Sequence, residues 1–160
     1  MALRGWATFA WQADYGQFYL IDREDPAFVP PTEFTPEMER RSLFVPATGI
    51  VIYTNDCLQQ HIRIAIHDSE PDHLPAERMS GKPWTRIETA NASFPSQMFT
   101  ISSPSMPDPL PNGPVFFLDT ADVTLRISWM EFQGSRDDSV PCDPDVIEIA
   151  FWPGASRLNS

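Results

Sequence analysis

The sequence lacks most of the patterns that mark an enzyme or a membrane protein. Its 160 residues contain no glycine-rich phosphate-binding loop, no GxSxG motif, no CxxC pair and no HExxH motif. No segment approaches the ~20 consecutive apolar residues of a membrane-spanning helix, and the N-terminus has no apolar run of signal-peptide length. We therefore expect a cytoplasmic protein that is not membrane-bound and carries no cofactor.

Cysteine is scarce as well. Cys57 and Cys142 are the only two, and the sequence does not show whether they come within reach of one disulfide. A thiol beside a histidine would be a candidate nucleophile, whereas a buried cysteine ordinarily serves as a small apolar side chain. None of the three histidines lies in a recognisable motif, so we expect reduced cysteines and no catalytic residue.

Basic residues are outnumbered two to one by acidic ones. Eleven Lys and Arg stand against 22 Asp and Glu, which gives a formal net charge of −11. A surface of this sign repels phosphate backbones, so we expect no direct binding of nucleic acid. It attracts a basic protein, including one that itself binds DNA, although an acid surplus is also typical of a protein that is merely soluble.

The acids gather in two segments. The first contains Asp68, Glu70 and Asp72, and the second contains Asp137, Asp138, Asp143 and Asp145. Each segment is either an ordinary solvated surface or a surface that steers a basic partner.

The segment IHDSEPDH, residues 66–73, combines both kinds of metal ligand. His67, Asp68 and His73 offer imidazole and carboxylate groups that suit Zn²⁺ or Mn²⁺. The five residues between the two histidines include a proline, however, and this spacing presets no coordination geometry. We expect a solvated strand end without metal, and a metal-dependent enzyme at these residues is the competing hypothesis.

Proline, with 17 residues, is abundant. It is excluded from helix interiors and central strands, so long irregular connections are expected, above all over residues 102–114, which hold five prolines from Pro104 onward. Between these connections the apolar residues alternate with polar ones, as Ile62, Ile64 and Ile66 do, which indicates half-buried strands. We predict one antiparallel β-sandwich domain over residues 1–160, with strands at 5–13, 17–22, 48–54, 60–67, 84–90, 97–101, 122–132 and 146–152.

One short helix is expected at Pro36–Ser42. Thr35 is a suitable N-cap and Pro36 suits the first helical position. Glutamates near the start and arginines near the end complement the helix dipole.

The aromatic stretch WQADYGQFYLID, residues 11–22, is predicted to be core. It forms either a hairpin or one long strand bent at Gly16, which can adopt a positive φ. Tyr15 is expected to be exposed at this bend. Three tryptophans lie among apolar strand residues and are expected to pack in the core, namely Trp11, Trp129 and Trp152. The other two, Trp6 and Trp84, are the candidates for a carbohydrate-binding platform.

The order of these features resembles the ComJ/Nin family, inhibitors of the DNA-entry nuclease of competent bacteria. The resemblance rests on YGQFYLID, on EFTPEMERRSLFVPATGIVIYT, on HIRIAIHDSEP and on the late strand TLRISWMEF. It covers the first 70 residues closely and the last 40 loosely. The proline-rich segment from Ser102 and the acidic segment from Gly134 are longer than the family pattern, so the target is either a competence nuclease or a secreted DNase toxin.

The resemblance implies a non-enzymatic inhibitor or immunity protein that occupies the DNA site of a basic nuclease. The acidic residues of both clusters and Asp108 would face the basic cleft, and Met106 and Leu110 would supply apolar anchors. The alternative is a β-sandwich that binds a carbohydrate or another small ligand. The sequence does not indicate an oligomeric state.

Overall fold

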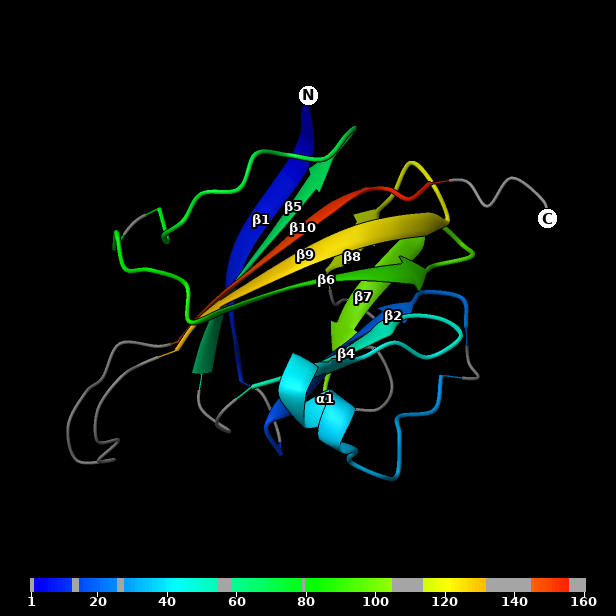
Figure 1. Cartoon of the computed structure of the whole chain (residues 1–160). Helices are drawn as coiled ribbons and strands as arrows, with labels where there is room; N and C mark the ends of the chain where they lie inside the picture. The colour runs from blue at the N-terminus through cyan, green and yellow to red at the C-terminus, as the bar shows by residue number, and fades with distance from the viewer. Residues whose placement is uncertain are drawn as a thin grey trace.

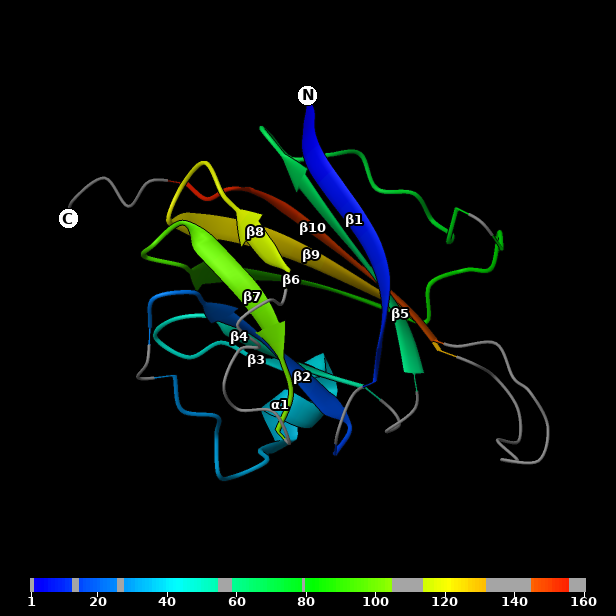
Figure 2. The same cartoon turned by 180° about the vertical axis from the view of Figure 1, so that it is seen from behind.

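A computed structural model shows an all-β protein, with two five-stranded sheets and one short helix in the part of the chain that it describes (Figures 1 and 2). The structure describes residues 2–12, 15–25, 28–54, 59–78, 80–104, 114–131 and 145–155. Sheet A has the order β1-β5-β10-β9-β6, and sheet B has the order β3-β4-β2-β7-β8. Sheet A consists of β1 (Leu3–Gln12), β5 (Gln59–His67), β10 (Asp145–Pro153), β9 (Asp122–Met130) and β6 (Arg86–Ser93). Sheet B consists of β3 (Leu43–Phe44), β4 (Ile50–Tyr53), β2 (Gln17–Asp22), β7 (Met98–Ser102) and β8 (Val115–Phe117).

The core lies between the inner faces of the two sheets. Ile62 and Ile64 of β5 are fully buried there together with Leu125 and Ile127 of β9, as their alternation predicts. Trp129 also lies in this core, and its indole N–H donates to the carbonyl of Tyr53 at 3.0 Å. This bond satisfies the one polar group that a buried tryptophan brings into an apolar interior.

The pairing differs from the prediction in two places. β5 pairs in parallel with β10, whereas every other strand pair of the described residues is antiparallel.

β1 and β2 form neither the expected hairpin nor one bent strand of a single sheet. β1 pairs with β5 in sheet A, whereas β2 pairs with β4 and β7 in sheet B. The chain crosses between the sheets through Tyr15 and Gly16, both at positive φ, and Tyr15 is 76% exposed as expected.

Helix α1 (Pro36–Arg41) confirms its sequence signals. The Thr35 side chain accepts a hydrogen bond from the Met38 amide, and Pro36 occupies the first turn. Ser42 ends the helix in the left-handed conformation, with its N–H donating to the Met38 carbonyl. The helix is too short to cross a membrane, and no helix among the described residues is long and apolar enough to do so.

Several strand limits differ from those expected. β6 continues to Ser93, so the turn before β7 lies at residues 94–97 and not at 91–95. β3 and β8 were not predicted, and they are only two and three residues long. Strands this short carry no periodic signal in a sequence.

The two edge strands of sheet A differ in the hydrogen bonds that their outer backbone groups make. At the β6 edge, the Arg41 guanidinium donates to the Thr89 carbonyl at 2.8 Å and the Gly49 amide donates to the Ser93 carbonyl at 2.9 Å. Apart from its ladder with β5, the backbone of β1 makes no hydrogen bond within the described part of the chain. The β6 edge is therefore partly capped, and the β1 edge is open.

Candidate protein-interaction surface

The first acidic cluster lies directly after β5. The carboxylate of Asp68 accepts a hydrogen bond from the Ala2 amide at 2.6 Å and another from the Ser69 hydroxyl at 3.1 Å. The Ala2 bond is the main reason that the pKa of Asp68 is lowered. The Asp68 amide in turn donates to the Ala2 carbonyl at 3.0 Å. Asp68 thus stays ionised and joins the cluster to the start of β1.

Arg126 of β9 holds the rest of this cluster against sheet A. Its guanidinium donates to the Pro71 carbonyl at 2.9 Å and lies 4.0 Å from the Glu70 carboxylate, whose side chain is 70% exposed. Arg126 also lies over the Trp152 ring, with 5.5 Å between the guanidinium carbon and the ring centroid. Asp72 is exposed beside these residues. The cluster is therefore anchored through its backbone, and its carboxylates face solvent.

The remaining predicted contact residues are mostly outside the described residues. These are Met106, Asp108, Leu110, Asp137, Asp138 and Asp143. Asp145 is described, and it differs from the prediction of an exposed loop residue. It is the first residue of β10, pairs in register with Gln60 and is 2% exposed. Because its carboxylate is buried in the sheet, we remove Asp145 from the candidate surface.

A polar network covers the outer face of sheet A beside the cluster. Glu148 of β10 lies 3.9 Å from Arg63 of β5 and 3.9 Å from Arg78 of the long connection after β5. Sequence reasoning missed this network, although Arg63 and Glu148 each occupy a polar position of an alternating strand. Their pairing becomes visible only with the strand register, which places them directly opposite each other.

Both histidines of the IHDSEPDH segment lie close enough to this network for the charge of Glu148 to act on them. The His73 ring lies 3.2 Å from the Ser128 hydroxyl. Burial lowers the pKa of His67 and of His73, and the nearby Arg126 lowers both further, whereas Glu148 raises both. No three His, Cys, Asp or Glu side chains of the described residues lie together as a metal-binding group.

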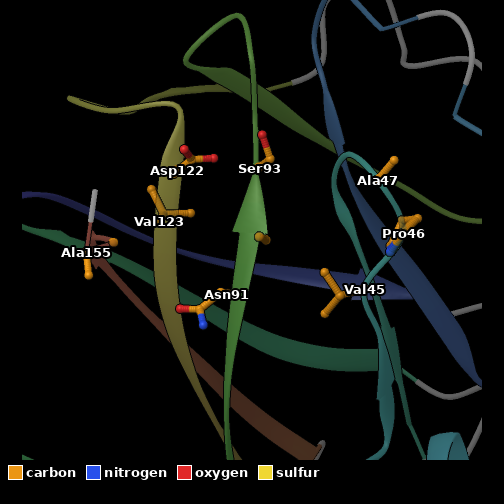
Figure 3. A pocket seen from close by; sticks show the side chains of 10 residues that line it. Val45, Pro46, Ala47, Asn91, Ser93, Asp122, Val123 and Ala155 are labelled. Carbon is orange, nitrogen blue, oxygen red and sulfur yellow. The ribbon is translucent and has the colours of Figure 1, made fainter. Parts of the chain in front are cut away.

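A hollow of about 620 Å³ lies at one end of the sandwich (Figure 3). Asp122, Asn91 and Ser93 supply its polar side chains, and Val45, Pro46 and Val123 belong to its apolar lining. The Asn91 side-chain oxygen is already used, because it accepts a hydrogen bond from the Thr124 hydroxyl at 2.9 Å. The ten lining residues include no aromatic ring, so this hollow lacks the stacking platform of a carbohydrate site.

A second hollow, of about 290 Å³, lies between β1 and β8 at the open side of the sandwich. Trp6, Phe116 and Phe117 belong to its lining, and Trp6 and Phe117 are 61% and 69% exposed. The Arg63 guanidinium lies over the Trp6 ring at 5.4 Å. Of the two tryptophans left open by the sequence, Trp6 thus lies at an exposed aromatic edge, whereas the indole N–H of Trp84 donates to the Leu74 carbonyl at 2.9 Å.

Comparison with known proteins gives a match in fold. No family model and no curated protein matches the sequence. The crystal structure of ComJ, inhibitor of the DNA-degrading activity of NucA, from Bacillus subtilis, matches with a TM-score of 0.71 at 14% identity, over 96% of this chain and 100% of ComJ. The product of crocagin biosynthetic gene J matches with a TM-score of 0.57 at 16% identity, over 97% of this chain and 100% of that one. The resemblance noted in the sequence is confirmed as a likeness of fold, and the chain has the ComJ fold over nearly its whole length.

Proposed function

We propose that this protein is a non-enzymatic inhibitor or immunity protein that binds a bacterial nuclease and blocks its DNA-binding site. The observation that carries the proposal is the fold match to ComJ, which extends over 96% of this chain and agrees with the family resemblance of the sequence motifs. No catalytic residue and no cofactor is part of the proposal.

Charge supports the choice of partner. A nuclease must present a basic surface to the phosphates of DNA, and this protein has a net charge of −11. Complementary charge accelerates association of two proteins and weakens in salt. A basic nuclease or nuclease toxin in the cytoplasm is therefore the partner that we propose.

The proposed contact surface combines the anchored and the longer acidic segments. Asp68, Glu70 and Asp72 present their carboxylates on a backbone that Arg126 and Ala2 hold in place, so little conformational entropy is lost on binding. Asp137, Asp138 and Asp143 would extend the acidic surface, with Asp108 beside the apolar anchors Met106 and Leu110. Such apolar anchors inside a polar rim supply much of the affinity in protein interfaces.

The test is capture of a partner from the native lysate with this chain as bait, at low salt and at about 0.5 M salt, where the screening length falls to roughly 4 Å. We expect one basic nuclease whose cleavage of DNA stops when the chain is added. Glu70→Gln with Asp72→Asn should slow association several-fold at low salt, whereas Glu37→Gln on α1 should not. Absence of a nuclease at both salt concentrations would overturn the proposal.

Binding of a carbohydrate or another small ligand is the second candidate, favoured by the aromatic lining of the hollow between β1 and β8. Arg4 is the only charged side chain of that lining, whereas sugar recognition needs several hydrogen-bonding groups around the ring platform. Quenching of the tryptophan fluorescence by a glycan, and disappearance of this quenching in Trp6→Ala, would support this candidate.

A further inference from the structure

We propose that the open edge of β1 is a self-association surface, on which a second copy of this chain adds its own β1 antiparallel to the first. The two five-stranded A sheets would then join into one continuous sheet across a two-fold axis. This inference does not depend on the proposed function, because it concerns the chain alone.

Among the four sheet edges, β1 is the one that no other described part of the chain protects. β3 and β8 are two and three residues long, and short edge strands resist pairing with other chains. The β6 edge has two of its carbonyl groups occupied by Arg41 and Gly49. β1 offers ten residues, lies at the outer margin of sheet A in Figure 2, and makes no backbone hydrogen bond on its free side within the described residues.

The composition of β1 also lacks the usual safeguards. Natural edge strands carry lysine, proline or inward-facing charges that prevent further pairing. The ten residues LRGWATFAWQ contain one charge, Arg4, and no proline. Arg4 lies at the bulge near the start of the strand and is paired with Asp119 at 3.3 Å, so it does not guard the regular part of the edge.

The choice of a second copy rests on the self-complementary size pattern of β1. From Gly5 onward the pairing with β5 is regular, and the segment Gly5–Trp11 is centred on Thr8. In an antiparallel pair with the two-fold axis at Thr8, Gly5 faces Trp11, Trp6 faces Ala10 and Ala7 faces Phe9. Each cross-strand pair thus joins a small residue to an aromatic one, and opposite residues share a face of the sheet.

The same register also meets the symmetry requirement of a dimer and keeps like charges apart. An interface of two identical chains must be complementary to itself, and with the axis at Thr8 the Arg4 residues of the two copies lie at opposite ends of the paired segment. Apart from its chain neighbours, a Cβ at Gly5 would have no atom within 4 Å, which leaves room beside the hollow between β1 and β8 for Trp11 of the second copy. The net charge of −11 on each copy opposes the association, so screening by salt should favour it.

The mass of the purified chain in solution tests the inference, measured by sedimentation over a range of concentrations at low salt and at about 0.5 M salt. We expect a monomer of 18.1 kDa to convert to a species of twice that mass as concentration rises, and to do so more readily at high salt. The proposed nuclease complex has the opposite salt dependence, so failure of one proposal is distinguishable from failure of the other. A monomer under all conditions would overturn the inference.

Variants locate the surface. Gly5→Lys and Thr8→Lys each place a charge on the β1 edge twice per dimer, and each should raise the concentration for half-association by roughly tenfold or more. Thr89→Lys adds the same charge to an exposed position of β6 and should have no such effect. If Gly5→Lys does not fold, Thr8→Lys gives the result. Association that survives both β1 variants, or that Thr89→Lys abolishes, would overturn the inference.

Amide hydrogen exchange provides a second readout on the unmodified chain. The amides of β1 should gain protection as the concentration rises, while those of β6 should not change. Protection gained in β6 instead, or gained in β1 only when a glycan or another protein is added, would assign the edge to a different occupant and overturn the inference.

Discussion

The two edges of sheet A show how one sheet can be closed on one side and open on the other. At β6, a helix and a loop from elsewhere in the chain bring Arg41 and Gly49 to the strand carbonyls. At β1, the strand is longer and nearly uncharged, and its free side has no such contact within the described residues. Among the described residues, edge protection in this sheet therefore comes from tertiary contacts on the β6 side only.

The largest loss of stability is expected from Gly49→Ala at the closed β6 edge. Gly49 has a φ of +75°, and a Cβ there would lie 2.6 Å from the Leu20 carbonyl oxygen. We expect the free energy of unfolding to fall by about 3 kcal/mol, because strain and a backbone clash add. Urea denaturation measures this.

The matched control is Gly5→Ala at the open edge, where a Cβ meets nothing within 4 Å. Its effect should be within about 1 kcal/mol and of either sign. Equal losses of unfolding free energy in Gly49→Ala and Gly5→Ala would contradict the difference between a closed β6 edge and an open β1 edge.

Arg41→Ala removes the side-chain contact that caps β6. It deletes the hydrogen bond to the Thr89 carbonyl and the 3.5 Å ion pair with Glu88. The expected loss is about 1.5 kcal/mol, with faster amide exchange in β6 and unchanged exchange in β1. Arg40→Ala, whose side chain is exposed and 3.9 Å from Glu37, should cost close to zero. A similar loss in Arg40→Ala would mean that the charge, and not the cap, matters.

Thr35→Ala tests whether α1 itself maintains the closed edge. The Thr35 hydroxyl accepts a hydrogen bond from the Met38 amide at the start of the helix. Loss of such an N-cap lowers the free energy of unfolding by about 1 kcal/mol. Thermal unfolding measures the loss, and Thr35→Ser should restore most of the stability. A neutral Thr35→Ala would show that packing of Met38 alone holds the helix.

The smallest effect is expected from pH, on the outer face between the two edges. The pKa values of His67 and His73 are lowered in the folded protein, chiefly by burial. The unfolded chain therefore takes up protons first as the pH falls below the ordinary histidine range, and stability that is present above that range is lost on acidification. Denaturant midpoints between pH 8 and pH 5 measure the loss, and His67→Gln with His73→Gln should flatten the profile. An unchanged slope in the double variant would assign the loss to carboxylates.

The sequence predicted the elements whose signals are local. Alternation identified the buried faces of β5 and β9, and Thr35 with Pro36 located the helix start. It did not predict that β10 pairs in parallel with β5, because the pattern of a strand does not name its neighbour. For the same reason the Arg63–Glu148 pair was missed, and Asp145 was assigned to a loop although it begins a buried strand. The fold class followed from local signals, whereas the surface needed the register.

The parallel pairing of β10 also has a consequence for how the chain folds. β10 lies between β5 and β9, so the last strand of the described residues occupies the centre of sheet A. Neither the β1-β5 pair nor the β9-β6 pair can join the other until β10 has been synthesised and inserted. Long-range pairing of this kind slows folding, so during translation the chain should expose two half-sheets with apolar faces until β10 emerges from the ribosome.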